Sequence, residues 1–309
     1  MIYFIFLIIF AALLTAFLIW FKSERSYSSS KSVADAYDNW TKDSILEALW
    51  GDHIHLGFYE DLKAIKDFRK AKIDFVHELV KWSGIDKLPR GSRILDVGCG
   101  IGGSSRILAN DYGFEVIGIT ISPGQVKRAN ELTHSDLHCS FQVMDALSLS
   151  FEEGSFDGVW SVEAGPHMPD KQKYADEMLR VLRPGGVLAV ADWNRRDMKD
   201  GKYSFLERII LRQLLNQWAH PEFSSIKSFT HNLSSSSFSG GFVEADDWTS
   251  FTLPSWDESI LEGFRHPRKI LKLGLNSFFK GLREIPTILL MKWAFSIGLM
   301  NFGVFRTRG

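Results

Sequence analysis

The most uniform apolar stretch of the chain is residues 1–21, which contain no charged side chain. A helix rises about 1.5 Å per residue, so this stretch would cross the roughly 30 Å hydrocarbon core of a bilayer. Trp20 and Phe21 fall where interfacial aromatic residues are common, and the basic residues within 22–31 follow them. The pattern predicts a single-pass transmembrane helix with the rest of the chain on the cytoplasmic side. A cleaved signal peptide is the alternative, disfavoured because the run lacks a basic start.

Beyond a short serine-rich linker, helix-like and strand-like patterns alternate. Apolar residues at three- and four-residue steps over 64–79 predict an amphipathic helix that ends near Gly84. Further helices are predicted at 104–112, from a cap at Ser122, and from a cap at Asp170 to 182, and strands at 94–97, 115–121, 141–144, 157–162 and 187–192. Residues 183–186 are predicted to be a turn. Alternating strands and helices predict an α/β protein with a parallel, doubly wound sheet.

The pattern changes after Trp193. Residues 204–218 predict an amphipathic helix, 223–240 a serine-rich loop and 241–248 another strand, and helices rich in Phe, Leu and Ile follow around 270–282. The expected domains are an anchor at 1–21, a linker and site-covering segment at 22–62, a cofactor-binding core at 63–193 and a substrate cap with the last strands at 194–309. A second membrane span at 285–305 is disfavoured, because Lys292 interrupts it.

A glycine-rich turn, residues 98–103, follows the first predicted strand. Ligands of such sheets bind at the carboxyl ends of the strands, where glycine lets a ligand approach the backbone amides closely. Gly98, Gly100 and Gly103 also fit the dinucleotide fingerprint, so a nicotinamide-dependent oxidoreductase is an alternative. That class usually carries an acid at the end of the second strand, where this chain has Thr120, which disfavours it. A non-catalytic cofactor-binding module is a third alternative.

Composition and charge narrow these classes. The formal net charge is −1, which does not favour a nucleic-acid partner, and the two cysteines cannot form a disulfide framework. The charge is uneven, however: residues 265–309 carry +8, residues 22–31 carry +2, and residues 32–264 carry −11. The two basic segments are expected at an anionic membrane surface.

Four separately placed motifs resemble the class I S-adenosylmethionine-dependent methyltransferases. They are Asp96-x-Gly98-x-Gly100-x-Gly102, Asp145-Ala146, Phe156-Asp157 with Trp160-Ser161, and Leu182-Arg183-Pro184-Gly185-Gly186. The resemblance implies a Rossmann-like doubly wound sheet whose last strand, near 299–307, is antiparallel. It also implies S-adenosyl-L-methionine as the cofactor.

Further motifs look like the tocopherol-type methyltransferases: Tyr37-Asp38 and the segments 50–57, 118–123 and 160–171. The N-terminal anchor and residues 286–291 most resemble the cyanobacterial 2-methyl-6-phytylbenzoquinol methyltransferases. This resemblance implies C-methylation of 2-methyl-6-phytyl- and 2-methyl-6-solanesyl-1,4-benzoquinol, on the way to tocopherols and plastoquinone, at a plasma or thylakoid membrane. A tocopherol γ-C-methyltransferase is the nearest alternative. The acceptor would be drawn from the bilayer, and the cap would hold its tail.

The resemblance and the chemistry of the cofactor together assign binding residues. Asp96 and the loop would hold the amino-acid end, Thr120 or Ser122 the ribose, and Asp145 the adenine. The full cofactor-binding set is Asp96, Gly98, Cys99, Gly100, Gly102, Thr120, Ser122, Gln125, Asp145, Ala146 and Ser161. Cys99 has no chemical role in this assignment, and Gln125 could instead be a capping partner of Ser122.

The acceptor is a ring carbon beside a phenolic oxygen, and a general base near that hydroxyl would make the ring a better nucleophile. His167 and Glu163, which follow the fourth strand, are the first candidates, and His55 is the next, with His53 beside it. Each could instead be a hydrogen-bonded structural residue. No metal site is predicted, because these histidines share no ligand spacing.

Overall fold

A computed structural model describes residues 15, 20–22, 25–62, 66–198 and 201–309. The anchor predicted at 1–21 therefore lies almost entirely outside the described residues. Within the described ranges, no helix combines the length and the apolar character needed to cross a membrane.

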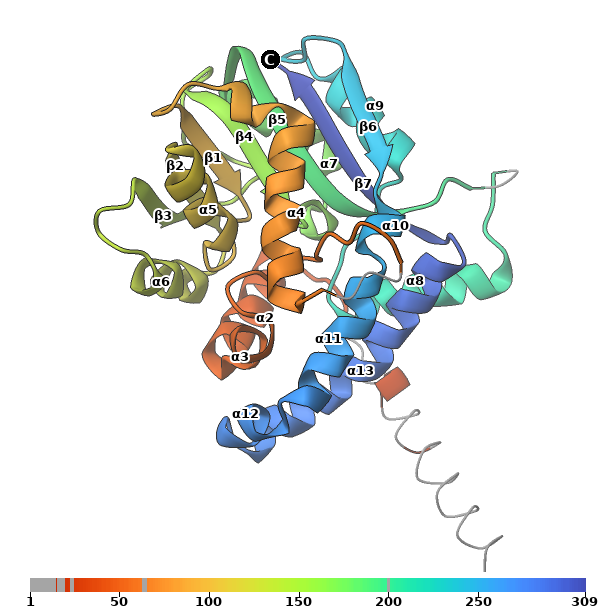
Figure 1. Ribbon diagram of the computed structural model, residues 1–309. Helices are drawn as coiled ribbons and strands as arrows, with labels where there is room; N and C mark the ends of the chain where they lie inside the picture. Colours follow the sequence, from red (N-terminus) through yellow and green to blue (C-terminus); the bar gives the residue numbers. More distant parts are fainter. Residues whose placement is uncertain (1–14, 16–19, 23–24, 63–65, 199–200) are drawn as a thin grey trace, which may run out of the picture.

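Seven strands form one mixed sheet (Figure 1), in the order β3-β2-β1-β4-β5-β7-β6. The strands are β1 (Arg93–Val97), β2 (Glu115–Thr120), β3 (Cys139–Val143), β4 (Phe156–Val162), β5 (Leu182–Arg195), β6 (Val243–Asp247) and β7 (Met300–Arg308). The first five are parallel, and β7 runs antiparallel to both β5 and β6. The predicted doubly wound sheet with an antiparallel last strand is confirmed.

Helices cover both faces of this sheet and the carboxyl ends of its strands. They are α2 (Ser30–Asp43), α3 (Ile45–Trp50), α4 (Phe68–Ser83), α5 (Gly103–Tyr112), α6 (Pro123–Leu132), α7 (Lys171–Val181), α8 (Phe205–Gln217), α9 (Ile226–Ser235), α10 (Thr249–Thr252), α11 (Pro254–Arg265), α12 (Pro267–Lys272) and α13 (Leu275–Ser296), with short 3₁₀ turns η1 (Ile85–Lys87) and η2 (Gly165–His167). Capping agrees with the sequence: Asp67 caps the start of α4, and Gly84 ends it with φ +77°.

Two hydrophobic clusters hold the layers together, one on each face of the sheet. Successive strand residues point to opposite faces, so Ile94 joins the cluster of α4 and α5, whereas Leu95 joins that of α7 and α9. Both side chains are fully buried. The carboxyl ends of the five parallel strands therefore lie together at one edge of this packed sheet.

The structure differs from the sequence predictions at two places. Residues 183–186 belong to β5 but form a bulge, because Phe156 pairs with Leu182 while Gly158 pairs with Val187. The loop predicted at 223–240 is wrong, since α9 occupies much of it. Ser225 and Ser228 form its capping box, and Phe229 and Leu233 bury its inner face.

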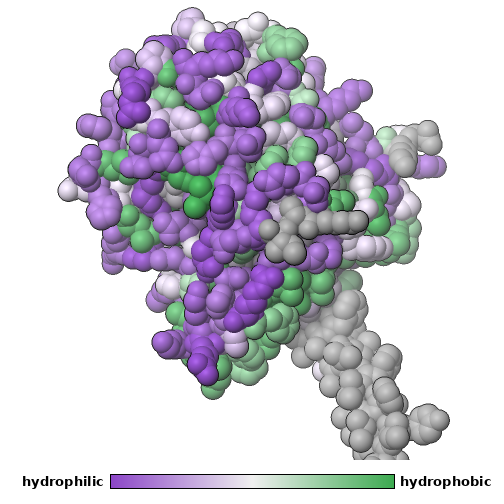
Figure 2. Space-filling model, in the orientation of Figure 1, coloured by the Kyte–Doolittle hydropathy of each residue, from purple (hydrophilic) through white to green (hydrophobic). Residues whose placement is uncertain are grey.

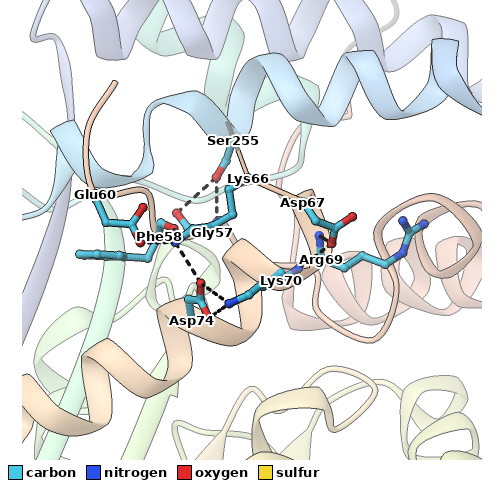
Figure 3. Close-up of polar contacts among 9 residues, drawn as sticks. All are labelled: Gly57, Phe58, Glu60, Lys66, Asp67, Arg69, Lys70, Asp74 and Ser255. Carbon is cyan, nitrogen blue, oxygen red and sulfur yellow. Dashed lines mark hydrogen bonds and ion pairs between the residues drawn. The ribbon is translucent and has the colours of Figure 1, made fainter. Parts of the chain in front are cut away.

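The segment that links α3 to α4 is fastened over the strand ends. Figure 3 shows Gly57 held to α11, where its amide donates to Ser255 Oγ at 2.8 Å. Lys66 Nζ donates to the Phe58 carbonyl at 3.2 Å and pairs with Asp74 on α4 at 2.9 Å. These contacts fix the chain that carries His53 and His55.

Candidate functional site

A cavity of about 270 Å³ lies at the carboxyl ends of the parallel strands. One side is formed by strand ends and their loops, including Asp96, Gly98 and Asp145. The other side comes from α2, α3, the 52–56 segment, α11 and α13. Figure 1 shows these helices gathered below the sheet, so the cavity lies between the sheet and a helical cap.

The glycine loop after β1 leaves backbone groups open to this cavity. Gly98 has φ +79°, and a Cβ there would lie 2.4 Å from the Ala164 Cβ, so only glycine fits. A Cβ at Gly100 would meet no atom within 4 Å, and Gly100 lines the cavity. The Gly98 and Cys99 amides donate to the Ile119 carbonyl, so the loop offers the amino-acid end of S-adenosylmethionine the open space at Gly100, just before α5.

Asp96, at the end of β1, is the carboxylate of this half. It is 2% exposed, and Ser105 Oγ donates to its Oδ2 at 2.5 Å. Burial raises its pKa to about 7, partly opposed by the Ser105 hydrogen bond. Because the acid lies in the cavity wall, a cationic ammonium group would favour its charged form.

The ends of β2 and β3 complete the cofactor half. Thr120 Oγ1 donates to Gln125 Oε1 at 2.7 Å, and both residues line the cavity. Ser122 instead caps α6 by accepting from the Gln125 amide at 3.1 Å, and its hydroxyl donates to Asp38 of α2. The Gln125 side chain is thus in the cavity wall and bonded to Thr120.

The loop after β3 contributes Asp145, which lines the cavity beside the buried Ala146. Gly102, Ser122 and Ser161 are the members of the predicted cofactor set that do not line it. Ser161 is fully buried and donates to the Val97 carbonyl at 2.7 Å, beneath the loop. Cys99 lines the cavity, and burial raises its thiol pKa well above the ordinary value.

Glu163 and His55 lie on the opposite, acceptor side of the cavity. Glu163 Oε1 accepts from the Leu56 amide at 2.7 Å, and burial raises the pKa of this carboxyl to about 8. His55 Nδ1 lies 2.7 Å from the Leu56 carbonyl, and its Nε2 lies 3.1 Å from His53 Nδ1. Both ring nitrogens of His55 are therefore engaged within the protein.

Burial shapes the charge of these histidines. It lowers the pKa of His53 to about 3, and Lys72 and Arg106 add to the effect. The Lys72 ammonium is itself buried, donates to the His53 carbonyl at 2.6 Å, and lies over the Phe68 ring. His53 and His55 are both buried and both line the cavity, and their ring nitrogens bond to each other and to the Leu56 carbonyl.

His167 has a different partner, which sequence analysis did not assign. The Tyr37 hydroxyl on α2 lies 2.7 Å from His167 Nε2. Burial, together with the charge of Lys171, lowers the pKa of His167 to about 3, so the imidazole is neutral at neutral pH. Tyr37 and His167 both line the cavity, and their contact joins α2 to η2 at the cavity wall.

His220 also lines this side of the cavity, and it is not among the site residues predicted from the sequence. Its ring packs at a tilt against His167, with ring centroids 4.3 Å apart, and also contacts Trp193 and Phe223. A left-handed turn at Ala219, with φ +54°, brings it here, and the His220 amide closes α8 on the Leu215 carbonyl at 2.9 Å. Trp218 and Trp256 stack beside it, so the acceptor side is aromatic.

No group of three or more His, Cys, Asp or Glu side chains in the described ranges is arranged to hold a metal ion. The sheet order, the glycine loop after β1, and the carboxylates of Asp96 near the end of β1 and Asp145 after β3 are together those of a class I S-adenosylmethionine-dependent methyltransferase. Residues 95–190 match the methyltransferase domain family.

Comparison with known proteins identifies the family within this class. The chain is 58% identical to the 2-methyl-6-phytyl-1,4-hydroquinone methyltransferase of Synechocystis, over 91% of this chain and 89% of that protein. It is 35% identical to the chloroplastic tocopherol O-methyltransferase of Arabidopsis thaliana, over 89% and 80%. The fold matches Haemonchus contortus phosphoethanolamine N-methyltransferase 2, solved with S-adenosylhomocysteine, with a TM-score of 0.73, 19% identity and coverage of 91% and 60%.

The chain belongs to the tocopherol-type methyltransferase family that includes the Synechocystis and Arabidopsis enzymes. It is an S-adenosylmethionine-dependent methyltransferase, as its motifs predict, and the nicotinamide-dependent alternative is set aside.

Proposed function

We propose that this enzyme methylates a ring carbon of a prenylated hydroquinone, 2-methyl-6-phytyl- or 2-methyl-6-solanesyl-1,4-benzoquinol, in tocopherol and plastoquinone biosynthesis. The observation that carries the proposal is the 58% identity to the Synechocystis hydroquinone methyltransferase across nearly all of both chains. Identity to the Arabidopsis tocopherol enzyme is 35%, which favours the quinol over a chromanol acceptor.

S-adenosylmethionine, when bound, supplies an electrophilic methyl group. The chain's own contribution begins with positioning, since a methyl transfer needs donor and acceptor held in line at near contact distance. Asp96 and the loop at Gly98 and Gly100 would hold the amino-acid end of the cofactor, and Asp145 its adenine. Trp193, Trp218 and Trp256 would pack around the acceptor ring.

Tyr37 and His167 would then orient the acceptor hydroxyl. When the Tyr37 hydroxyl donates a hydrogen bond to the neutral His167 Nε2, the Tyr37 oxygen can still accept a hydrogen bond from the phenol. That bond draws the phenolic proton away from the ring and enriches the ring in electrons. Glu163, whose pKa is about 8, is largely protonated at neutral pH and would be a neutral, hydrogen-bonding side chain in the cavity wall.

We also propose that residues 1–21 are a single-pass membrane anchor, with the catalytic domain on the cytoplasmic side of a plasma or thylakoid membrane. Trp20, at the end of the apolar run, donates from Nε1 to Thr287 Oγ1 of α13 at 3.0 Å. Gln217 of α8 donates to the Trp20 carbonyl at 3.1 Å. An anchor fastened there would hold α13 beside the bilayer.

The surface of the cap supports the same placement. Figure 2 shows hydrophobic side chains gathered over α12 and α13, in the lower part of the molecule. Phe279 is 63% exposed and Leu289 50% exposed on α13, while Arg268, Lys269 and Lys272 of α12 are exposed basic residues. An apolar face with a basic border fits contact with anionic lipids, from which an insoluble quinol could enter the enzyme.

The test uses the full chain in lipid vesicles with methyl-labelled S-adenosylmethionine. Separate reactions contain 2-methyl-6-phytyl-1,4-benzoquinol, 2-methyl-6-solanesyl-1,4-benzoquinol or γ-tocopherol. We expect label in the quinols. Label that appears in tocopherol alone would overturn the quinol assignment and favour the tocopherol alternative.

A further inference from the structure

One face of α13 forms a wall of the cavity. Gly281, Glu284 and Ile288 all line it, and their spacing of three and four residues puts them on one side of the helix. The outer side of α13 carries the exposed Phe279, at 63%, and Leu282, at 44%. The helix therefore separates the cavity from the apolar outer surface.

Gly281 is an unexpected residue for the interior of a helix of 22 residues. Glycine there costs about 1 kcal/mol relative to alanine. A Cβ at this position would lie 3.0 Å from Ile45 Cδ1 at the start of α3, and both residues line the cavity. A larger side chain would enter the cavity or push Ile45 into it, so glycine keeps this end of the cavity wide.

The same end of the cavity reaches the surface. Lys280 lines the cavity although its side chain is 47% exposed, and it pairs with Asp43 at the end of α2. A second ion pair, from Arg25 to Glu284 at 2.5 Å, also joins α13 to the N-terminal part of the chain. Between these polar contacts the wall is apolar, with Ile45, Leu49 and Ile288.

We propose that the prenyl tail of the acceptor runs along this face of α13 and leaves the cavity between α3 and α13, beside the close contact of Gly281 with Ile45, which forms one side of the passage. The proposal rests on the proposed function, which supplies a tailed acceptor. An apolar tail fits an apolar passage that opens beside the exposed Phe279 and Leu282. Gly281 then acts on tail selection and not on the transfer of the methyl group.

The experiment compares two acceptors that differ only in the tail: 2-methyl-6-phytyl-1,4-benzoquinol and its analogue with a single five-carbon prenyl group. In the full-length enzyme, Gly281→Leu should lower kcat/KM for the phytyl acceptor at least about tenfold more than for the short one, the size expected when methylenes lose their pocket. Gly281→Ala should give a smaller change in the same direction. Adding Ile45→Val to Gly281→Ala should restore part of the lost kcat/KM for the phytyl acceptor, because valine lacks the Cδ1 atom that the new Cβ would meet. Affinity for S-adenosylhomocysteine should stay unchanged.

Gly263→Ala is the matched control, because this helical glycine lies in α11 and its added Cβ would have only an ordinary contact, 3.7 Å from Ile270 Cδ1. It should leave the ratio of the two acceptors unchanged. If Gly281→Leu does not fold, Ile45→Phe narrows the same passage from α3 and carries the same expectation. Equal losses on both acceptors would show that Gly281 only packs helices, and would overturn the proposal.

The two proposals fail differently. A wild-type enzyme that methylates neither quinol overturns the proposed function, and the tail passage with it. If the wild-type enzyme methylates the phytyl acceptor and its five-carbon analogue, and no variant changes the ratio of their kcat/KM values, only the proposed tail passage is overturned.

Discussion

The two halves of the cavity are built in different ways. The cofactor half comes from consecutive strand ends and their loops, and its left-handed backbone positions, such as Gly98 and Gly100, are glycines. The acceptor half is assembled from α2, the 52–56 segment, the end of α8, α11 and α13. In the described ranges, the non-glycine residues with positive φ are Ser44, Glu163 and Ala219, and the last two lie at or beside this half.

The residue types at positive φ show which half of the cavity has the more strained backbone. Glycine adopts positive φ at little cost, so the cofactor loop needs no support from elsewhere. Glu163 and Ala219 keep the left-handed conformation only because the surrounding structure holds them there. The Glu163 amide, for example, donates to the Ala191 carbonyl at 2.7 Å. The acceptor half is thus the less local and more strained half of the site.

The largest effect is expected in the cofactor half. Asp96→Ala should weaken S-adenosylhomocysteine binding by about 100-fold, because charge-assisted hydrogen bonds to the ligand contribute roughly 1.5–3 kcal/mol each. Isothermal titration calorimetry measures the change. Asp136→Ala, at an exposed aspartate, is the control and should bind normally. Unchanged binding by Asp96→Ala would remove Asp96 from the cofactor site.

An intermediate effect is expected in the acceptor half, where substitutions should lower kcat and leave cofactor binding unchanged. Tyr37→Phe and His167→Ala each break the 2.7 Å contact between these side chains, and should lower kcat by about 100-fold, the range of a lost proton-directing group. Cofactor affinity should remain that of the wild type in both. His134→Ala, at an exposed histidine, should leave kcat intact.

Parallel losses of kcat and of cofactor affinity in the Tyr37 and His167 variants would contradict the division into two halves. Equilibrium binding of S-adenosylhomocysteine and steady-state kinetics on the same preparations separate these outcomes.

The smallest effect concerns strain. Ala219→Gly should raise the free energy of unfolding by up to about 1 kcal/mol, because glycine relieves the left-handed cost of alanine while loosening the unfolded chain. Ala34→Gly, inside α2, should lower it by a similar amount. Denaturant unfolding monitored by tryptophan fluorescence measures both. A loss of stability in Ala219→Gly would show that the turn carries no strain.

Local signals explain which predictions were confirmed. Periodicity and capping residues were sufficient for α4, which ends at Gly84, and for α6, which begins after Ser122. They were insufficient for α9, because its serine-rich sequence carries few apolar residues and is stabilised by burying Phe229 and Leu233 against the sheet. Residues 183–186 resemble a turn locally, yet neighbouring strands hold them in β5.

By itself, the sequence predicted the alternation of strands and helices in the core, the glycine loop, and the positions of Asp96 and Asp145 at the ends of their strands, because these depend on short segments whose geometry neighbouring residues decide. Only the tertiary structure brought Tyr37 to His167, packed His220 against His167, and set Gly281 against Ile45. Those pairs are separated by 53 to 236 positions along the chain. Their contacts form because helices from both ends of the chain pack over one edge of the sheet, and no local pattern encodes that packing.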